Sequence, residues 1–126
     1  MRNTATHIRS TQEVADRFHE LARQEKWFDI QDELFADNVR SIEPANSPYL
    51  GDTEGKAAVR AKAAAFVGRI EAAHSLSTSA PVVAGHHFAV SRDKDLTVQP
   101  HGRIRINEIM LYEVRNGKII SEQFFY

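Results

Sequence analysis

Cysteine is absent from the 126-residue sequence, and its absence excludes three kinds of chemistry. Such a chain forms no disulfide, holds no metal through thiolate ligands and offers no cysteine nucleophile. The sequence also lacks a run of about eighteen apolar residues and an apolar segment near the N-terminus, which membrane helices and secretory signals require. We therefore expect a cytoplasmic protein that does not bind membranes.

An excess of charge of either sign is also missing. The chain has 16 basic and 17 acidic residues, and its formal net charge is −1. Nucleic acids are bound mainly through dense positive charge, so they are not expected partners. Glycine-rich phosphate loops, nucleophile elbows and His-x-x-x-His pairs do not occur either. We expect no metal and no cofactor.

The length is that of one ordinary domain, which buries about two thirds of its unfolded surface. No internal repeat, low-complexity tract or linker divides the sequence. Residues 1–9 show no apolar pattern. We expect a flexible N-terminal tail over residues 1–9 and a single domain over residues 10–126.

Three segments have the apolar periodicity of amphipathic helices. The first begins at Ser10-Thr11-Gln12-Glu13, where serine and glutamate have the spacing of a capping box. The predicted helices span residues 10–24, 29–35 and 56–73. A short strand is predicted over residues 35–44, and a loop rich in turn-forming residues follows it.

The last third of the chain alternates between apolar and polar residues, as β-strands do. The predicted strands span residues 76–84, 86–99, 103–115 and 118–126. Asn116-Gly117 favours a tight hairpin turn, because both residues tolerate positive φ. The polar run Arg92-Asp93-Lys94-Asp95 is compatible with a bulge in one long strand or with a turn between two strands, and we expect one long bent strand.

Two motifs carry a resemblance to a known family. The hairpin from Glu108 to Tyr126 resembles the last hairpin of SnoaL-like proteins, and the segment from Leu34 to Pro44 is similar to one in steroid isomerases. Both families belong to the nuclear transport factor 2-like superfamily. The resemblance implies a cone-shaped α+β fold, in which a strongly bent, mostly antiparallel sheet and three helices enclose an apolar pocket.

The resemblance also points to Glu43, which stands before a proline as the catalytic aspartate of steroid isomerases does. Burial beside apolar neighbours would raise the pKa of this carboxyl and make it a competent base. The alternative is a strand-end carboxylate in contact with water. The family's first proton donor falls on Phe18, or on His19 if no gap is allowed, and its second falls near Met110. Phe18 fits the apolar stripe of the helix better than His19 does. Because Phe18 and Met110 cannot donate, the familiar steroid isomerase activity is not expected.

Glu108 and a histidine are the other candidates for acid–base chemistry. Glu108 lies on a mostly apolar strand face, where it either faces the pocket or forms a structural ion pair. His86 and His87 are adjacent on a strand and point to opposite sides, so at most one reaches the pocket. We name His87 as the candidate, with a structural histidine as the alternative.

Strand alternation and helical stripes divide the remaining residues between an inner and an outer face. The predicted pocket is lined by Phe18, Trp27, Phe35, Phe66, Met110, Gln123 and Phe125. The opposite sheet face is expected to form a homodimer through Ile109, Leu111 and Phe124.

Three functions stay open on this evidence. The pocket could hold a hydrophobic carbonyl compound for cofactor-independent isomerase, cyclase or dehydratase chemistry. It could instead bind a small apolar molecule without changing it. The domain could also serve only for dimeric interaction. A shared fold does not distinguish these classes, because function depends on the residues of the site.

Overall fold

The structure is a computed structural model, and it describes residues 7–126. Residues 1–6 of the predicted tail lie outside the described residues. The remainder of that segment contacts the domain. His7 Nε2 lies 2.9 Å from Glu13 Oε1, and Arg9 Nη2 forms an ion pair with Glu33 Oε2 at 3.0 Å. The helices are α1 (Thr11–Ala22), α2 (Trp27–Leu34) and α3 (Lys56–Val67). The strands are β1 (Phe35–Ile42), β2 (Thr53–Glu54), β3 (Ile70–Thr78), β4 (Val82–Ala84), β5 (His87–Val98), β6 (Gly102–Arg115) and β7 (Lys118–Phe125).

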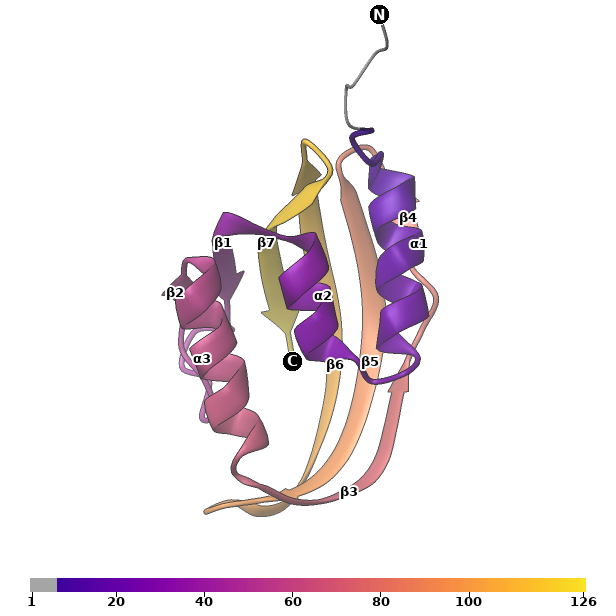
Figure 1. The fold of residues 1–126 in the computed structure, drawn as a ribbon. Helices are drawn as coiled ribbons and strands as arrows, with labels where there is room; N and C mark the ends of the chain where they lie inside the picture. The colour runs from indigo at the N-terminus through magenta and orange to yellow at the C-terminus, as the bar shows by residue number, and fades with distance from the viewer. Residues whose placement is uncertain (1–6) are drawn as a thin grey trace, which may run out of the picture.

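The strands form one bent sheet in the order β2-β1-β7-β6-β5-β3, with β4 paired to β5. All pairings are antiparallel except that of β1 with β7. The long strands β5 and β6 curve beneath α3, while α1 and α2 lie over the other end of the sheet (Figure 1). Two register shifts between β3 and β5 contribute to this curvature, because bulges bend and twist a strand.

The predicted start of the first helix is confirmed. The Ser10 side chain accepts a hydrogen bond from the Glu13 amide at 3.1 Å, and the Glu13 carboxylate accepts one from the Ser10 amide at 2.8 Å. These reciprocal bonds satisfy two amides that would otherwise lack partners at the helix start. The buried stripe of α1 includes Phe18, whose ring packs edge-on against Trp27 and Phe88.

Two boundaries of the central segment differ from the prediction. The third helix ends at Val67 with Gly68 as its C-cap, and residues predicted as its last turns belong to β3. High alanine content favours a helix there, but sheet pairing from Ile70 onward outweighs this local preference. Strand β5, in contrast, runs without a break through residues 92–95, which confirms the prediction of one long strand there.

The inner and outer faces of β7 are exchanged relative to the prediction. A bulge lies where Val114 pairs with Ile119 but Glu113 pairs with Ser121, which leaves Ile120 unpaired. One extra residue turns every later side chain to the opposite face of the sheet. The face shared with Met110 and Tyr112 therefore carries Phe124 and Glu122, while Phe125 and Gln123 lie on the outer face.

Apolar side chains form two clusters, one beneath each end of the helical layer. The larger lies between α1, α2 and the sheet, and the smaller gathers around Phe66, Leu96 and Val98 beneath α3. A cavity lies between them. Within residues 7–126, no helix is long and apolar enough to cross a membrane.

Candidate functional site

The cavity has a volume of about 600 Å³. Four of the predicted lining residues form part of its apolar wall: Trp27, Phe35, Phe66 and Met110. Three predicted lining residues do not reach it. Phe18 is fully buried in the core behind the wall, with its ring 4.7 Å from that of Tyr112, and the β7 bulge turns Gln123 and Phe125 away.

Lys62 organises one part of the polar wall. It lies on α3 between Val59 and Phe66 at helical spacing, so it shares their inward face. Its Nζ donates to Ser41 Oγ at 2.7 Å, to Glu43 Oε2 at 2.9 Å and to the Gly51 carbonyl at 3.2 Å. These acceptors occupy all three protons of the ammonium group and hold it in place.

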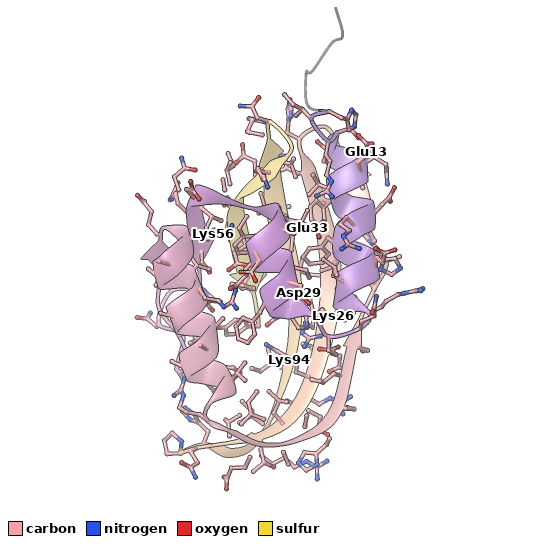
Figure 2. All side chains as sticks on the ribbon, viewed as in Figure 1. Glu13, Lys26, Asp29, Glu33, Lys56 and Lys94 are labelled. Atoms are coloured by element: carbon pink, nitrogen blue, oxygen red, sulfur yellow. The ribbon has the colours of Figure 1, made fainter. Side chains whose placement is uncertain are left out.

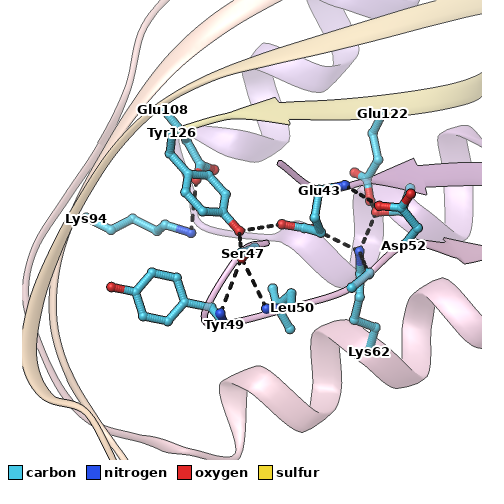
Figure 3. A network of polar contacts seen from close by, with 12 residues as sticks. Glu43, Ser47, Tyr49, Leu50, Asp52, Lys62, Lys94, Glu108, Glu122 and Tyr126 are labelled. Carbon is cyan, nitrogen blue, oxygen red and sulfur yellow. Dashed lines mark hydrogen bonds and ion pairs between the residues drawn. The ribbon is translucent and has the colours of Figure 1, made fainter. Parts of the chain in front are cut away.

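Both carboxylate oxygens and the backbone amide of Glu43 form hydrogen bonds, as Figure 3 shows. Its Oε2 accepts from Lys62, its Oε1 accepts from the Tyr126 hydroxyl at 2.6 Å, and its backbone amide donates to Asp52 at 2.7 Å. The Tyr126 hydroxyl also lies 2.6 Å from Ser47 Oγ. Burial, followed by the bond to Glu43, raises the pKa of Tyr126 and keeps its phenol protonated. Each oxygen of Glu43 thus has a donor within the protein.

Glu122 lies on the same wall and has fewer hydrogen bonds than Glu43. One of its oxygens, Oε2, accepts a hydrogen bond from Ser41 at 2.7 Å. Burial raises the pKa of this carboxyl to about 7, and the Ser41 bond and the charge of Lys62 offset only part of that effect. At neutral pH it is therefore close to half protonated, which suits a general acid or base.

Tyr112 lies opposite Glu122 on the neighbouring strand and lines the cavity. Burial raises its pKa well above the usual value, so the phenol stays protonated. Among residues 7–126, its hydroxyl has no hydrogen-bond partner within the protein. The tyrosine thus offers a donor close to Phe18 and Met110, the two positions at which the sequence lacks one.

The second lysine–glutamate pair comes from the long strands. Lys94 Nζ lies 3.6 Å from Glu108 Oε2, and both side chains line the cavity. Figure 2 shows Lys94 in the space that α2, α3 and the curved part of the sheet surround. Burial lowers the pKa of Lys94 and raises that of Glu108, with each group's charge partly offsetting the effect on the other. Burial thus disfavours the ionised pair.

Arg92 marks the side of the cavity near α2. Its guanidinium carbon lies 4.4 Å from the centre of the Trp27 ring, and its Nη2 is 2.9 Å from Glu25 Oε1. This arrangement stacks a cation on an aromatic wall and neutralises it with a carboxylate nearer to solvent. The pair fixes the position of Trp27 at the cavity.

The histidines do not take part in this site. His86 lies in the turn before β5 and His87 is the first residue of β5; both are exposed, and neither lines the cavity. The alternation of β5 places Phe88 and Val90 inward, so the side chain of His87 points to the outer face of the sheet. Among residues 7–126, no group of three histidine, aspartate or glutamate side chains is arranged to hold a metal ion.

The prediction missed the basic half of the site, although the sequence contains a signal for it. Val90, Leu96 and Val98 alternate inward along β5, and the same period places Arg92 and Lys94 on that face. Glu122 carries no such signal, because the bulge that turns it inward is not visible in the alternation of β7.

A cone of bent sheet and three helices around an apolar cavity defines the nuclear transport factor 2-like fold. The SnoaL-like domain family matches residues 9–126, and the chain belongs to this family. No curated protein matches the chain significantly.

Solved structures agree with this assignment. A protein of Mesorhizobium loti, named as a candidate SnoaL-like polyketide cyclase, is 33% identical over 94% of this chain and 100% of its own, with a TM-score of 0.87. A protein of Catenulispora acidiphila with a ketosteroid isomerase-like fold, in complex with trimethylamine, is 17% identical over 93% and 87% of the two chains, with a TM-score of 0.69. TerC, co-crystallised with polyporic acid, is 13% identical over 92% and 90%, with a TM-score of 0.68. The last two show likeness of fold alone.

Proposed function

We propose that the cavity binds a hydrophobic carbonyl compound and that the protein moves a proton on it without a cofactor, as an isomerase, cyclase or dehydratase does. The observation that carries this proposal is the convergence of three buried carboxyl groups, Glu43, Glu108 and Glu122, on one largely apolar cavity. Carboxyl groups in such surroundings are suited to removing and returning protons at carbon.

The hydrogen bonds suggest how the carboxyl groups divide the work. Both oxygens of Glu43 already accept a bond, so Glu43 serves best to position Lys62 and Tyr126. Glu122, with its pKa of about 7, is the better base for a carbon acid. The phenol of Tyr112 and the carboxyl of Glu108 then supply protons to the developing enolate oxygen, which Phe18 and Met110 cannot do.

Exchange of substrate protons for deuterium tests this assignment directly. We expect the protein to catalyse exchange at the α-carbon of cyclic hydrophobic ketones in D₂O, followed by NMR. Glu122→Gln should slow exchange about 100-fold, since a positioned base contributes at least that much. Glu113→Gln, on the outer face of β6, is the matched control and should have no effect. Loss of exchange in Glu43→Gln but not in Glu122→Gln would instead make Glu43 the base.

Binding without catalysis is the second candidate function. Its specific support is that two proteins of the same fold were solved as complexes with small molecules, trimethylamine and polyporic acid. The two functions differ in the fate of the ligand. A ketone that saturates the cavity and is recovered with all its α-protons after incubation in D₂O would favour binding alone.

Dimerisation through the outer sheet face belongs to the same proposal, with one change of residue. Ile109 and Phe125 pair across β6 and β7, and each is 47% exposed. Phe125 therefore replaces Phe124 in the predicted patch with Ile109 and Leu111. We expect a dimer in light scattering that Ile109→Glu dissociates, while Val82→Glu, at an exposed position on β4, does not. A wild-type monomer at tens of micromolar would refute the interface.

A further inference from the structure

Lys94 differs from Lys62 in the freedom of its amine. All three protons of Lys62 have acceptors at 2.7–3.2 Å. The nitrogen of Lys94 lies 3.6 Å from Glu108, beyond hydrogen-bond distance, and 5.6 Å from the centre of the Phe66 ring. In the part of the chain that the structure describes, no hydrogen bond engages this nitrogen. The amine is therefore available to another molecule in the cavity.

The backbone holds this amine on a rigid part of the fold. Lys94 lies in the middle of β5 and pairs with Ile106 on one side and Leu76 on the other. Its side chain, 18% exposed, lines both the main cavity and a smaller pocket of about 60 Å³ beside Glu43 and Tyr126. Figure 3 shows the lysine extending toward Glu108 within this space. A ligand carbonyl in the cavity can thus reach the amine.

The charge states of the pair fit nucleophilic chemistry. Removal of both groups from water lowers the pKa of Lys94 and raises the pKa of Glu108. Each change favours a neutral amine beside a neutral acid. A neutral amine attacks a carbonyl carbon, whereas the nitrogen of Lys62 is engaged by three acceptors.

We propose that Lys94 forms an imine with an aldehyde or ketone bound in the cavity and that Glu108 carries the protons of this step. The inference rests on the proposed function for the cavity and its carbonyl ligand, and it adds a covalent mode that the proposed function does not require. An amine 3.6 Å from a carboxyl group, in a largely apolar cavity, has both partners that imine formation needs.

The step balances without a further reactant. The Lys94 nitrogen bonds to the carbonyl carbon while the carbonyl π pair moves to oxygen, which takes the proton of Glu108. The nitrogen then returns one proton to the Glu108 carboxylate and leaves a carbinolamine. A second transfer from Glu108 expels the oxygen as water, and the nitrogen lone pair completes the C=N bond. Amine, aldehyde and carboxylic acid thus give a protonated imine, water and a carboxylate.

Reductive trapping tests the proposal with a defined probe. The full chain is incubated with limiting cyclohexanecarbaldehyde and cyanoborohydride, and intact mass and peptide mapping locate the product. We expect one adduct, with the mass of the probe less one oxygen atom, on Lys94. The chain's other four lysines, Lys26, Lys56, Lys62 and Lys118, serve as internal controls. Adducts spread over these lysines or confined to one of them would overturn the proposal.

Variants separate the amine from its proton carrier. Lys94→Met and Lys94→Arg should both lose the adduct, and the arginine variant keeps a cation beside Glu108 in case the methionine variant folds poorly. Glu108→Gln should slow trapping about 100-fold, as loss of a general acid does. Lys118→Met, at an exposed position outside the cavity, should label at the wild-type rate. An unchanged adduct in either Lys94 variant would contradict the assignment.

A binding measurement distinguishes failure of this inference from failure of the proposed function. Trp27 is the only tryptophan and lines the cavity, so its fluorescence reports occupancy. Cyclohexylmethanol cannot form an imine and serves as the matched ligand. Binding of both probes without an adduct would refute the imine and leave the proposed function intact. An adduct at Lys94 without deuterium exchange of ketones would support the imine and refute proton transfer. No binding and no adduct would refute both.

Discussion

The cavity contains two lysine–glutamate pairs that share a composition and differ in their surroundings. Lys62 and Glu43 come from a helix and a strand end, lie 2.9 Å apart and have hydrogen bonds to Ser41, Gly51 and Tyr126. Lys94 and Glu108 come from two adjacent strands, lie 3.6 Å apart and have no such bonds within residues 7–126. Both glutamates are almost completely buried.

This difference shows that the number of hydrogen bonds decides what a buried charge can do. A buried ion pair is stable only when further hydrogen bonds replace the lost water. The first pair meets this condition and becomes a fixed part of the architecture. The second pair does not, so its protons and its lone pair remain available for chemistry. Lys94 and Glu108 lie diagonally across the two strands, since Lys94 pairs with Ile106 and Glu108 pairs with Arg92.

The largest expected effect is a difference between the two lysines in their contribution to the free energy of unfolding. Lys62→Met should lower the free energy of unfolding by about 3 to 5 kcal/mol, because it leaves the Glu43 carboxylate buried without its cation. Lys94→Met should cost much less or stabilise the fold, since it replaces a poorly solvated amine with an apolar group of similar shape. Chemical denaturation measures both. Equal losses in the two variants would show that the pairs are equivalent.

The next effect concerns Glu122, which lies beside the first pair. Its pKa is raised to about 7, from a usual value of 4.5. The folded state therefore keeps the proton to higher pH than the unfolded state. The free energy of unfolding falls as the pH rises from 4.5 to 7, by about 3 kcal/mol in total, and this loss persists above pH 7.

Glu122→Gln should remove this pH dependence. Relative to wild type, the variant should become more stable by about 3 kcal/mol between pH 4.5 and pH 8, whatever constant offset the loss of the Ser41 bond introduces. Denaturation curves at several pH values measure the slope. The Glu113→Gln variant controls for the loss of a carboxylate outside the cavity. Parallel curves for wild type and Glu122→Gln would show that Glu122 ionises normally.

Local patterns in the sequence predict the fold and part of the cavity wall. The capping box at Ser10 and the Asn116-Gly117 hairpin depend on neighbouring residues, and the structure confirms the first and contains the turn of the second. The cavity residues Glu43 and Glu108 follow from resemblance and from strand alternation. Such local signals suffice for the fold and for half of the polar wall.

The features that the sequence does not predict depend on how separate segments of the chain meet. Gln123 and Phe125 face outward because one residue of β7, Ile120, is left unpaired opposite β6. The bonds of Lys62 to Gly51 and Ser41 likewise depend on how a loop and a strand meet α3. Neither feature has a signature within a single segment.

A smaller effect is expected from the Tyr126 hydroxyl, which donates to Glu43 of the first pair. Tyr126→Phe removes the donor to Glu43 and should lower the free energy of unfolding by about 1 to 2 kcal/mol, as loss of a hydrogen bond to a charged group does. Tyr49→Phe removes a hydroxyl from the neighbouring loop and is the matched control, because that hydroxyl has no hydrogen bond within the described residues 7–126. Similar losses in both variants would indicate a general effect of the loop.

The smallest effect is expected on the outer face of the sheet, where opposite charges also meet. Arg103 and Arg105 bond in pairs to Asp95 and Asp93 across β5 and β6, at 3.0–3.4 Å. Water screens these exposed charges and solvates each partner when the other is removed. Arg105→Ala should therefore leave the free energy of unfolding unchanged within error, in low salt and in high salt. Denaturation of this variant beside Lys62→Met compares an exposed pair with a buried one of similar geometry. A loss as large as that in Lys62→Met would show that charge pairing, and not burial with its hydrogen bonds, sets the difference between the two cavity pairs.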